Sequence, residues 1–206
     1  MRFNGFNQTN KLIELRSDVS SQFASSLILV GPYLSDGLQI KLVGNIFSKP
    51  YILLTCEIMK SFGFSCFIYK DEIKIKPKKK VSIKNYSVES DWSSASYLYS
   101  IVALSGIELN LSSFKLNSLQ GDSKLSELYE NFGVKTYFKN DGITLRRSKS
   151  QRIKSFIELD LIENPDLAQT IIVTSLGLSI HTKLTGLNTL KIKETDRLVA
   201  LKNEIS

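Results

Sequence analysis

The chain has 206 residues, with 42% hydrophobic and 23% charged residues and a formal net charge of +7. This composition is typical of a soluble globular protein with one large domain or two small ones. No apolar run reaches the roughly 20 residues that a membrane-spanning helix needs. The positive charge favours anionic partners, and a phosphorylated metabolite fits it as well as a nucleic acid. Because the chain has one histidine, His181, the sequence argues against catalytic triads and zinc sites that depend on histidine.

Two features of the sequence bear on the cellular compartment. The amino terminus, Met1 to Gly5, lacks the apolar core of a secretory signal peptide. The two cysteines, Cys56 and Cys66, lie in apolar surroundings and do not have the spacing of metal ligands. We therefore expect a cytoplasmic protein whose cysteines are buried thiols in a reducing environment.

The first part of the chain predicts two helices, a strand and a hairpin after a polar opening. Ser20 or Asp18 is expected to cap the first helix, and Gly31 follows its last residue. Pro50 favours the first turn of the second helix, where its missing N–H costs nothing. The predicted elements are a helix over 24–30, a strand over 38–43, a helix over 48–62, and strands over 64–69 and 72–76.

A basic run, 74–80, follows this hairpin and contains five lysines in seven residues. No aromatic side chain interrupts the run, although aromatic side chains favour the binding of single-stranded nucleic acid. We interpret the run as a solvated loop rather than a nucleic-acid site.

The middle of the chain predicts an extended segment, two helices, a strand and a second hairpin. Gly133 is expected to end the second of these helices, and the sequence 140–142, Asn-Asp-Gly, is a strong hairpin turn. The predicted elements are an extended segment over 81–88, a helix that begins within 90–97 and runs to about Leu104, a strand over 107–111, a helix over 125–132, and strands over 134–138 and 143–147.

The last part of the chain predicts two further strands, each followed by a helix. Asn164 is expected to cap the first of these helices, with Pro165 in its first turn. The predicted elements are a strand over 155–161, a helix over 167–176, a strand over 181–187, and a helix after Glu194.

These elements form a repeat with an interval of about 73 residues, since a polar cap followed by an apolar helix recurs near Ser20, Ser93 and Asp166. The second helices recur at nearly the same interval. The third copy reaches Ser206 after its second helix. Because a chain that stops inside a repeat leaves apolar faces uncovered, we expect a segment of a longer protein or another source for the missing surface.

The stretch 191–198 carries the densest charge in the third copy. Thr195 is expected to cap the following helix, and on a helix Lys193 and Arg197 would share one face. Two like charges on one face favour an anion between them, and a phosphate or carboxylate would serve. Glu194 beside them could move a proton. The alternative is a solvated helix start with mixed charges.

Six motifs, in this order along the chain, resemble those of the EPSP synthase family (3-phosphoshikimate 1-carboxyvinyltransferase). They are Val19-Ser20-Ser21-Gln22-Phe23, Ser48-Lys49-Pro50-Tyr51, Asp91-Trp92-Ser93-Ser94-Ala95-Ser96-Tyr97, Gln120-Gly121-Asp122, Pro165-Asp166 and Lys193-Glu194-Thr195-Asp196-Arg197. The resemblance implies an α/β (α+β) fold of repeated βαβαββ units, the inside-out α/β barrel of enolpyruvyl transferases, here incomplete. It implies that 1–88 is the last repeat of one domain and that 89–206 holds the first repeat and part of the second repeat of the other.

The resemblance also implies a reaction. The family transfers the enolpyruvyl group of phosphoenolpyruvate to the 5-hydroxyl of shikimate 3-phosphate and releases phosphate, in the shikimate pathway to aromatic amino acids. It implies no metal and no organic cofactor, no nucleic-acid or membrane partner, and a monomer when the enzyme is complete.

The same resemblance assigns roles to individual residues. Asp166 would take the 5-hydroxyl proton, and Glu194 would transfer a proton to or from the enolpyruvyl carbon. Arg197 would bind phosphoenolpyruvate, and Gln22 would lie between the two substrates. The residues implied to contact shikimate 3-phosphate are Ser20, Ser21, Gln22, Ser48, Tyr51, Asp166, Thr189 and Lys193.

Several of these roles have a simpler alternative. Ser20 and Ser21 could be helix caps, Tyr51 could be a core residue, and Asp166 could only favour the helix dipole. Thr189 departs from the asparagine that the family commonly has at its position.

The sequence also lacks groups that the family uses. The Lys-Ser pair, the Gly-rich Asn-Ala-Gly-Thr loop and the C-terminal Arg and Lys of the family are not in these residues. Those groups would supply most of the positive charge around phosphoenolpyruvate, so we expect the segment alone to be inactive or nearly so.

Three other functions compete with this interpretation. A sister enolpyruvyl transferase acts on UDP-N-acetylglucosamine, but it would use a loop cysteine as acid, and neither Cys56 nor Cys66 lies in such a loop. A second alternative is a non-catalytic module of repeated α/β units that binds phosphate or nucleic acid. The third is a structural half that pairs with a second chain carrying the missing groups.

Overall fold

The computed structural model describes residues 11–16, 20–78, 80, 85–148, 150 and 152–205. Contacts divide the chain into a first unit, Met1–Tyr86, and a second unit, Ser87–Ser206, and each unit has a hydrophobic core of its own. The assignment of these units to particular repeats of a longer enzyme stays a prediction. None of the helices in the described ranges combines the length and hydropathy that a membrane crossing requires.

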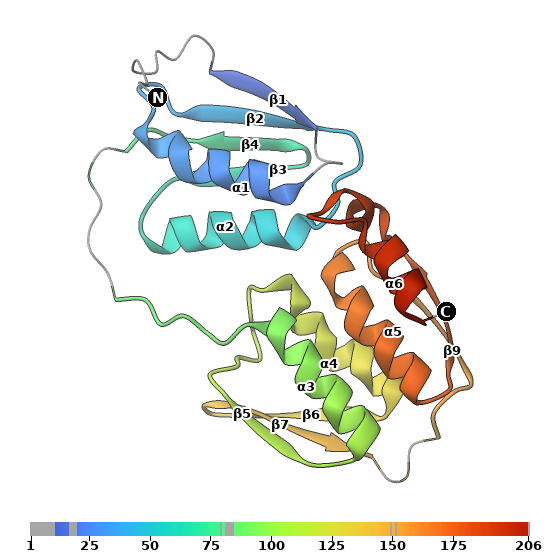
Figure 1. Cartoon of the computed structure of the whole chain (residues 1–206). Helices are drawn as coiled ribbons and strands as arrows, with labels where there is room; N and C mark the ends of the chain where they lie inside the picture. Colours follow the sequence, from blue (N-terminus) through green and yellow to red (C-terminus); the bar gives the residue numbers. More distant parts are fainter. Residues whose placement is uncertain are drawn as a thin grey trace, which may run out of the picture. The chain divides into compact units, whose positions relative to one another are not determined.

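The first unit is a four-stranded sheet with two helices (Figure 1). The sheet order is β1-β2-β4-β3, in which β1 and β2 are parallel and the other pairs are antiparallel. Its elements are β1 (Leu12–Arg16), α1 (Ser21–Val30), the 3₁₀ turn η1 (Gly31–Tyr33), β2 (Leu38–Val43), α2 (Lys49–Ser61), β3 (Cys66–Tyr69) and β4 (Glu72–Ile75). The unit therefore has the complete order βαβαββ.

Alternation along the strands decides which face of this sheet is buried. In β2, Leu38, Ile40 and Leu42 are buried between more exposed residues, and Leu38 and Ile40 lie opposite buried isoleucines of β4. The helices α1 and α2 cover this face with apolar side chains such as Ile28 and Ile52. The amphipathic pattern thus fixes the register of the sheet, because a shift of one residue would expose the core side chains.

Strand β1 was not predicted, since the sequence analysis assigned only a polar opening to this region. Its alternating apolar residues, Ile13 and Leu15, are only partly buried, and the neighbouring Leu12 is half exposed, so the burial pattern that marks a strand is weak. The strand is held instead by parallel pairing with β2, from Leu12 opposite Gln39 to Arg16 opposite Val43. Pairing with a distant segment is not visible in a single stretch of sequence.

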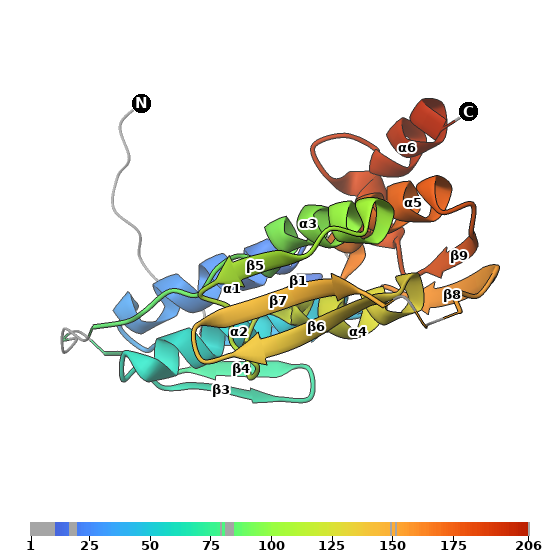
Figure 2. The same ribbon diagram turned by 90° about the horizontal axis from the view of Figure 1, so that it is seen from below.

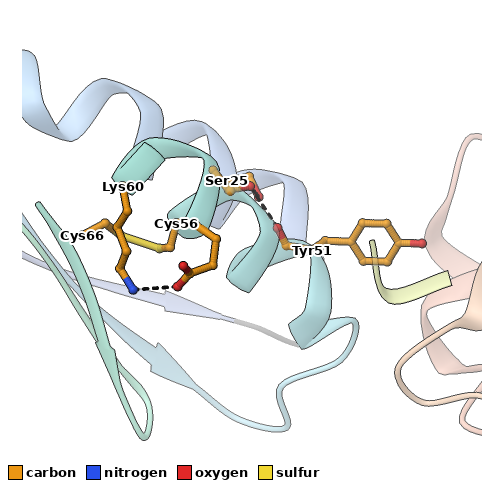
Figure 3. The surroundings of a disulfide bond; sticks show 7 residues. Ser25, Tyr51, Cys56, Lys60 and Cys66 are labelled. Carbon is orange, nitrogen blue, oxygen red and sulfur yellow. Dashed lines mark hydrogen bonds and ion pairs between the residues drawn. A yellow bond between two sulfur atoms is a disulfide. The ribbon is translucent and has the colours of Figure 1, made fainter. Parts of the chain in front are cut away.

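The two cysteines are buried as predicted, but the expectation of two separate thiols is wrong for this structure. Figure 3 shows Cys56 on α2 bonded to Cys66 on β3. Their Cα atoms lie 5.6 Å apart, a separation that a disulfide spans. The pairing arises because α2 packs against β3. A sequence separation of 10 residues does not by itself reveal this contact.

The second unit contains parts of two copies of the same plan, with strands β5, β6 and β7 side by side and α3 in contact with their sheet (Figure 2). Its sheets have the orders β5-β7-β6, which is antiparallel, and β8-β9, which is parallel. The elements are α3 (Trp92–Ser105), β5 (Leu109–Ser112), η2 (Gly121–Lys124), α4 (Leu125–Leu128), η3 (Tyr129–Phe132), β6 (Val134–Lys139), β7 (Gly142–Arg147), β8 (Phe156–Asp160), η4 (Pro165–Leu167), α5 (Ala168–Gly177), β9 (His181–Thr185), η5 (Asn188–Ile192) and α6 (Arg197–Ile205).

The pairing of the strands confirms the predicted repeat. The parallel pair β8 and β9 corresponds to β1 and β2, and the antiparallel pair β5 and β7 corresponds to β2 and β4. The helix predicted over 125–132 is one α-helical turn, α4, between two 3₁₀ turns, a form common in short helical segments. Of the extended segment predicted over 81–88, residues 81–84 lie outside the described part of the chain.

Large aromatic side chains fill the core of the second unit. Trp92, which the resemblance places where a small residue is usual, is fully buried and packs edge-on against Phe114 at 4.9 Å between ring centroids. The Tyr129 hydroxyl lies 2.9 Å from Thr174 Oγ1, and burial raises the pKa of this phenol. The phenol therefore stays protonated at neutral pH and can donate a hydrogen bond in the core.

A buried carboxylate connects three helical segments of this unit. Asp122, at the start of η2, is 1% exposed. It accepts hydrogen bonds from Ser93 Oγ, in the first turn of α3, and from Asn164 Nδ2, which precedes η4, at 2.9 Å for the latter. Asn164 occupies the predicted cap position, but its side chain bonds Asp122 instead of capping η4. One carboxylate therefore fixes the relative positions of three segment starts.

Replacement of Asp122 by Ala should leave the partly buried Ser93 hydroxyl and the buried Asn164 amide without this acceptor. We expect the free energy of unfolding of the second unit to fall by roughly 2–4 kcal/mol, since the lost hydrogen bonds involve a buried charged group. Trp92 is the sole tryptophan, so urea denaturation followed by its fluorescence reports on this unit.

Glu163→Ala is the matched control, because Glu163 makes a surface ion pair with Lys124 at 3.7 Å. Its cost should stay within about 0.5 kcal/mol. Equal losses in the two variants would show that Asp122 has no special structural role.

Candidate functional site

The charged residues predicted for catalysis meet around one carboxylate of the second unit. Asp166 lies in η4 and accepts from Lys193 Nζ at 3.4 Å through Oδ2 and from Arg197 Nη1 at 3.1 Å through Oδ1. All three side chains are partly buried, with exposed fractions of 29% for Asp166, 23% for Lys193 and 31% for Arg197. The sequence analysis predicted an anion between the two cations, and in this structure Asp166 provides it.

The backbone reaches this arrangement in a way the sequence analysis did not predict. Lys193 follows η5 in an extended conformation, with φ −80° and ψ −161°, and Arg197 is the first residue of α6. The expectation that Lys193 and Arg197 share a helix face is therefore wrong. They converge because the extended residues between η5 and α6 let both side chains reach the same carboxylate.

Glu194 is the most exposed of the predicted catalytic residues. Its Oε2 accepts from Arg197 Nη2 at 2.9 Å, and its side chain is 78% exposed. A hydrogen bond from its own backbone N–H and, next, one from Arg197 lower the pKa of Glu194. At neutral pH Glu194 is therefore ionised and can accept a proton, and it must be protonated before it can act as an acid.

The cap of α6 is Asp196, and the prediction of Thr195 is wrong. Asp196 Oδ1 accepts from the backbone N–H groups of Leu198 and Val199, at 3.0 and 3.1 Å. A carboxylate at this position also faces the positive end of the helix dipole. The cap anchors the helix whose first residue is Arg197.

Thr189 is the neighbouring residue for which the resemblance implied substrate contact. It lies in η5, which packs against η4, and is 5% exposed. Within the described part of the chain, its Oγ1 has no hydrogen-bond partner. A buried hydroxyl without a partner is costly, so this group suits a contact that forms when a ligand is bound.

In the first unit, the predicted phosphate-binding hydroxyls lie at two helix starts. Because α1 and α2 each follow one of the parallel strands β1 and β2, both helices begin at the same edge of the sheet (Figure 1). The helices also lie side by side, since Thr55 Oγ1 donates to Ser25 Oγ at 3.0 Å. Ser20, Ser21 and Gln22 open α1, and Ser48 and Tyr51 open α2.

The two serines that precede these helices differ in their local roles. Ser20 Oγ accepts from Gln22 N at 3.2 Å, so Ser20 caps α1, as one alternative proposed. Ser48 has left-handed backbone angles, φ 53° and ψ 36°, and its side chain makes no capping hydrogen bond. A non-glycine residue in this conformation is uncommon and is often found at binding sites. Ser48 is therefore the stronger candidate of the two for a ligand contact.

Tyr51 is partly buried, and Figure 3 shows its ring pointing away from the disulfide and from Ser25. It is therefore not part of the buried core of the first unit. The serine set and the set around Asp166 belong to different units. That they form one pocket stays a prediction.

One residue near Asp166 was missed by the sequence analysis. Gln169 lies one turn after Asp166, and with its amide oriented to satisfy both neighbours it donates to the Asp166 backbone oxygen at 2.9 Å and accepts from Arg197 Nη1 at 3.3 Å. The spacing of three residues on a helix could have indicated proximity to Asp166. The contact between Gln169, in α5, and Arg197, in α6, joins two separate helices, and no sequence pattern indicated it.

A model of the family described as EPSP synthase (3-phosphoshikimate 1-carboxyvinyltransferase) matches residues 2–206. The chain belongs to the EPSP synthase family. It is 42% identical to the 3-phosphoshikimate 1-carboxyvinyltransferase of Bacteroides fragilis, over 100% of this chain and 50% of that protein. The enzyme of the same name from Methanospirillum hungatei is 32% identical, over 91% of this chain and 44% of its own length. The chain thus spans about half the length of the curated relatives that it matches.

A solved structure gives the same answer for the fold. The structure of EPSP synthase from Acinetobacter baumannii matches with a TM-score of 0.67 at 18% identity, over 93% of this chain and 44% of that one. This likeness confirms the predicted α/β fold of the EPSP synthase family, in a chain that covers part of it.

The corrected cap of α6 can be tested by two substitutions. Asp196→Ala removes the acceptor of two backbone N–H groups, so we expect the opening free energy of α6 to fall by about 1 kcal/mol. Thr195→Ala should change it by no more than a few tenths of a kcal/mol. Amide hydrogen exchange at Leu198 and Val199 measures this opening, and a larger effect for Thr195→Ala would restore the original prediction.

Proposed function

We propose that this chain contributes to the transfer of the enolpyruvyl group from phosphoenolpyruvate to the 5-hydroxyl of shikimate 3-phosphate, with release of phosphate. One observation carries the proposal. In a chain of the EPSP synthase family, a carboxylate on η4, Asp166, meets two cations, Lys193 and Arg197, and Arg197 also pairs with a second carboxylate, Glu194. These are the residue types that a proton transfer next to anionic substrates requires.

The proposed roles in the second unit follow from chemistry and position. Asp166 accepts the proton of the attacking hydroxyl, and Glu194 exchanges a proton with the methylene carbon of the enol. Arg197 can bind a carboxylate or phosphate through two nitrogens, which suits phosphoenolpyruvate. Lys193 supplies a point charge for shikimate 3-phosphate. The Thr189 hydroxyl, which has no hydrogen-bond partner among the described residues, supplies a neutral hydrogen bond to it.

In the first unit, the proposed role is to hold the phosphate of shikimate 3-phosphate. The N-termini of α1 and α2 direct backbone N–H groups and the positive ends of two helix dipoles to one edge of the sheet. Ser21 and Ser48 add hydroxyl donors there. Ser20 Oγ accepts from the backbone N–H of Gln22 as a cap, and its own O–H can still donate to the phosphate.

A test of binding separates the proposal from a nonspecific attraction of anions. Arg197→Ala should weaken the binding of phosphoenolpyruvate to the 206-residue chain by about tenfold or more, because a charge-assisted contact is lost. Lys183→Ala is the control, since it also removes one positive charge of the second unit but breaks only a surface pair with Glu158. Calorimetric titration measures both, and equal weakening in the two variants would contradict the proposed site.

The chain alone should turn over slowly. It spans about half the length of its relatives, and the cations that the family places around phosphoenolpyruvate are largely outside these residues. We expect phosphate release from the two substrates at well below about 1 per second, a typical lower rate for enzymes. A coupled phosphate assay measures the rate, and turnover at or above that level would overturn this prediction.

A cytoplasmic location and a monomeric complete enzyme are parts of the same proposal. The location predicts that the disulfide between Cys56 and Cys66 is reduced to two thiols in the cell, because the cytoplasm keeps cysteines reduced. Rapid alkylation of freshly lysed cells under denaturing conditions, followed by mass spectrometry, should therefore find both cysteines modified. Recovery of an unmodified, linked pair in most of the molecules would contradict a reducing compartment.

A further inference from the structure

The two oxygens of Asp166 bind two different cations. Oδ2 accepts from Lys193, and Oδ1 accepts from Arg197. A phosphate or carboxylate ligand would contact the same two groups through two of its own oxygens. The carboxylate of Asp166 thus occupies the position of an anionic ligand toward Lys193 and Arg197.

Gln169 provides a second hydrogen-bond acceptor for Arg197. With its amide oriented to satisfy both neighbours, its oxygen accepts from Arg197 Nη1 at 3.3 Å and its nitrogen donates to the Asp166 backbone oxygen at 2.9 Å. The same Arg197 nitrogen therefore bonds both the Asp166 carboxylate and the Gln169 amide. The other terminal nitrogen donates to Glu194. Arg197 is held in place from three sides.

We propose that Asp166 and Gln169 together hold Arg197 in place, so that an incoming anion has to displace the Asp166 carboxylate from Lys193 and Arg197. Gln169 is then a positioning residue, since it acts through Arg197 and the backbone of Asp166. The consequence of this displacement for catalysis rests on the proposed function. An anion that takes over the two cations leaves the Asp166 oxygens open to the proton of the acceptor hydroxyl, so anion binding and proton transfer are coupled.

The charges of Asp166, Lys193, Glu194 and Arg197 decide how strongly the loss of Asp166 should change the affinity for an anion. Asp166 and Glu194 balance Lys193 and Arg197, so a further anion meets a neutral cluster. Removal of the Asp166 charge leaves one net positive charge at partly buried groups. Such groups are screened by solvent less than exposed ones are. An anion should therefore bind more tightly to the Asp166→Asn variant, although this variant is expected to be inactive.

The probe is inorganic phosphate, titrated into the 206-residue chain and followed by calorimetry. Asp166→Asn should tighten phosphate binding about tenfold relative to the unchanged chain. Glu158→Gln is the matched control, because it makes the same change in charge and also releases a cation, Lys183, but at the surface of the same unit. Its effect on phosphate affinity should stay within about twofold.

Gln169→Met gives an independent test without any change in charge. It removes both hydrogen bonds of the amide while keeping a side chain of similar length, so Arg197 leaves Asp166 more easily. We expect phosphate binding to tighten by about two- to threefold. Thermal unfolding followed by Trp92 fluorescence checks that each variant is folded. If the Asp166→Asn variant is unfolded, the phosphate affinity of Gln169→Met tests the proposal instead.

Unchanged or weaker phosphate binding in a folded Asp166→Asn variant would overturn the inference. So would tightening of equal size in Glu158→Gln, since that would reflect overall charge. A different result would contradict the proposed function: an affinity of the chain for shikimate 3-phosphate and phosphoenolpyruvate no higher than its affinity for inorganic phosphate. The two failures are distinguishable, because the phosphate titration does not depend on recognition of either substrate.

Discussion

The position of every proposed functional group depends on one constraint, the placement of helix N-termini by parallel strands. A helix that follows a strand begins near the end of that strand, so parallel neighbours bring their following helices to a common edge. In the first unit this brings Ser20 and Ser48 to one edge of the sheet. In the second unit the parallel pair β8 and β9 does the same for Asp166, which follows β8 in η4, and for Lys193 and Arg197, which follow β9. Helix starts present unpaired N–H groups, so such an edge favours anions before any charged side chain is added.

Much of the fold could be predicted because short-range rules decide it. The Asn-Asp-Gly turn before β7 and the amphipathic alternation of β2 each fix local structure without help from distant residues. The repeat interval then related the copies to one another. Strand β1 was not predicted because its sequence pattern is weak and its stability comes from pairing with β2. The disulfide between Cys56 and Cys66 was not predicted for a similar reason, since it depends on how α2 packs against β3.

The candidate site was predicted in composition and less well in geometry. The spacing of Lys193 and Arg197 indicated two cations that would share an anion, and in the structure the Asp166 carboxylate bonds both; that a ligand binds them stays a prediction. The helix assumed for both residues was wrong. The residue that binds them, Asp166, had been assigned a role as a base, and nothing in the sequence connected that role to the cations. Gln169 had no assigned role at all, because its contact with Arg197 joins segments that are distant in sequence. Side-chain partners across segments follow from packing, which local patterns do not encode.

The two units carry different chemistry, and this difference bears on how the proposed reaction would proceed. The first unit offers hydroxyls and backbone N–H groups at helix starts, which bind an anion without themselves exchanging protons at neutral pH. The second unit offers carboxylates and cations, of which Asp166 is already engaged by Lys193 and Arg197. A substrate phosphate held by the first unit alone would leave Asp166 paired with those cations. Only an anion that reaches the second unit can release it, so on our proposal the base becomes available when the anionic substrate is in place.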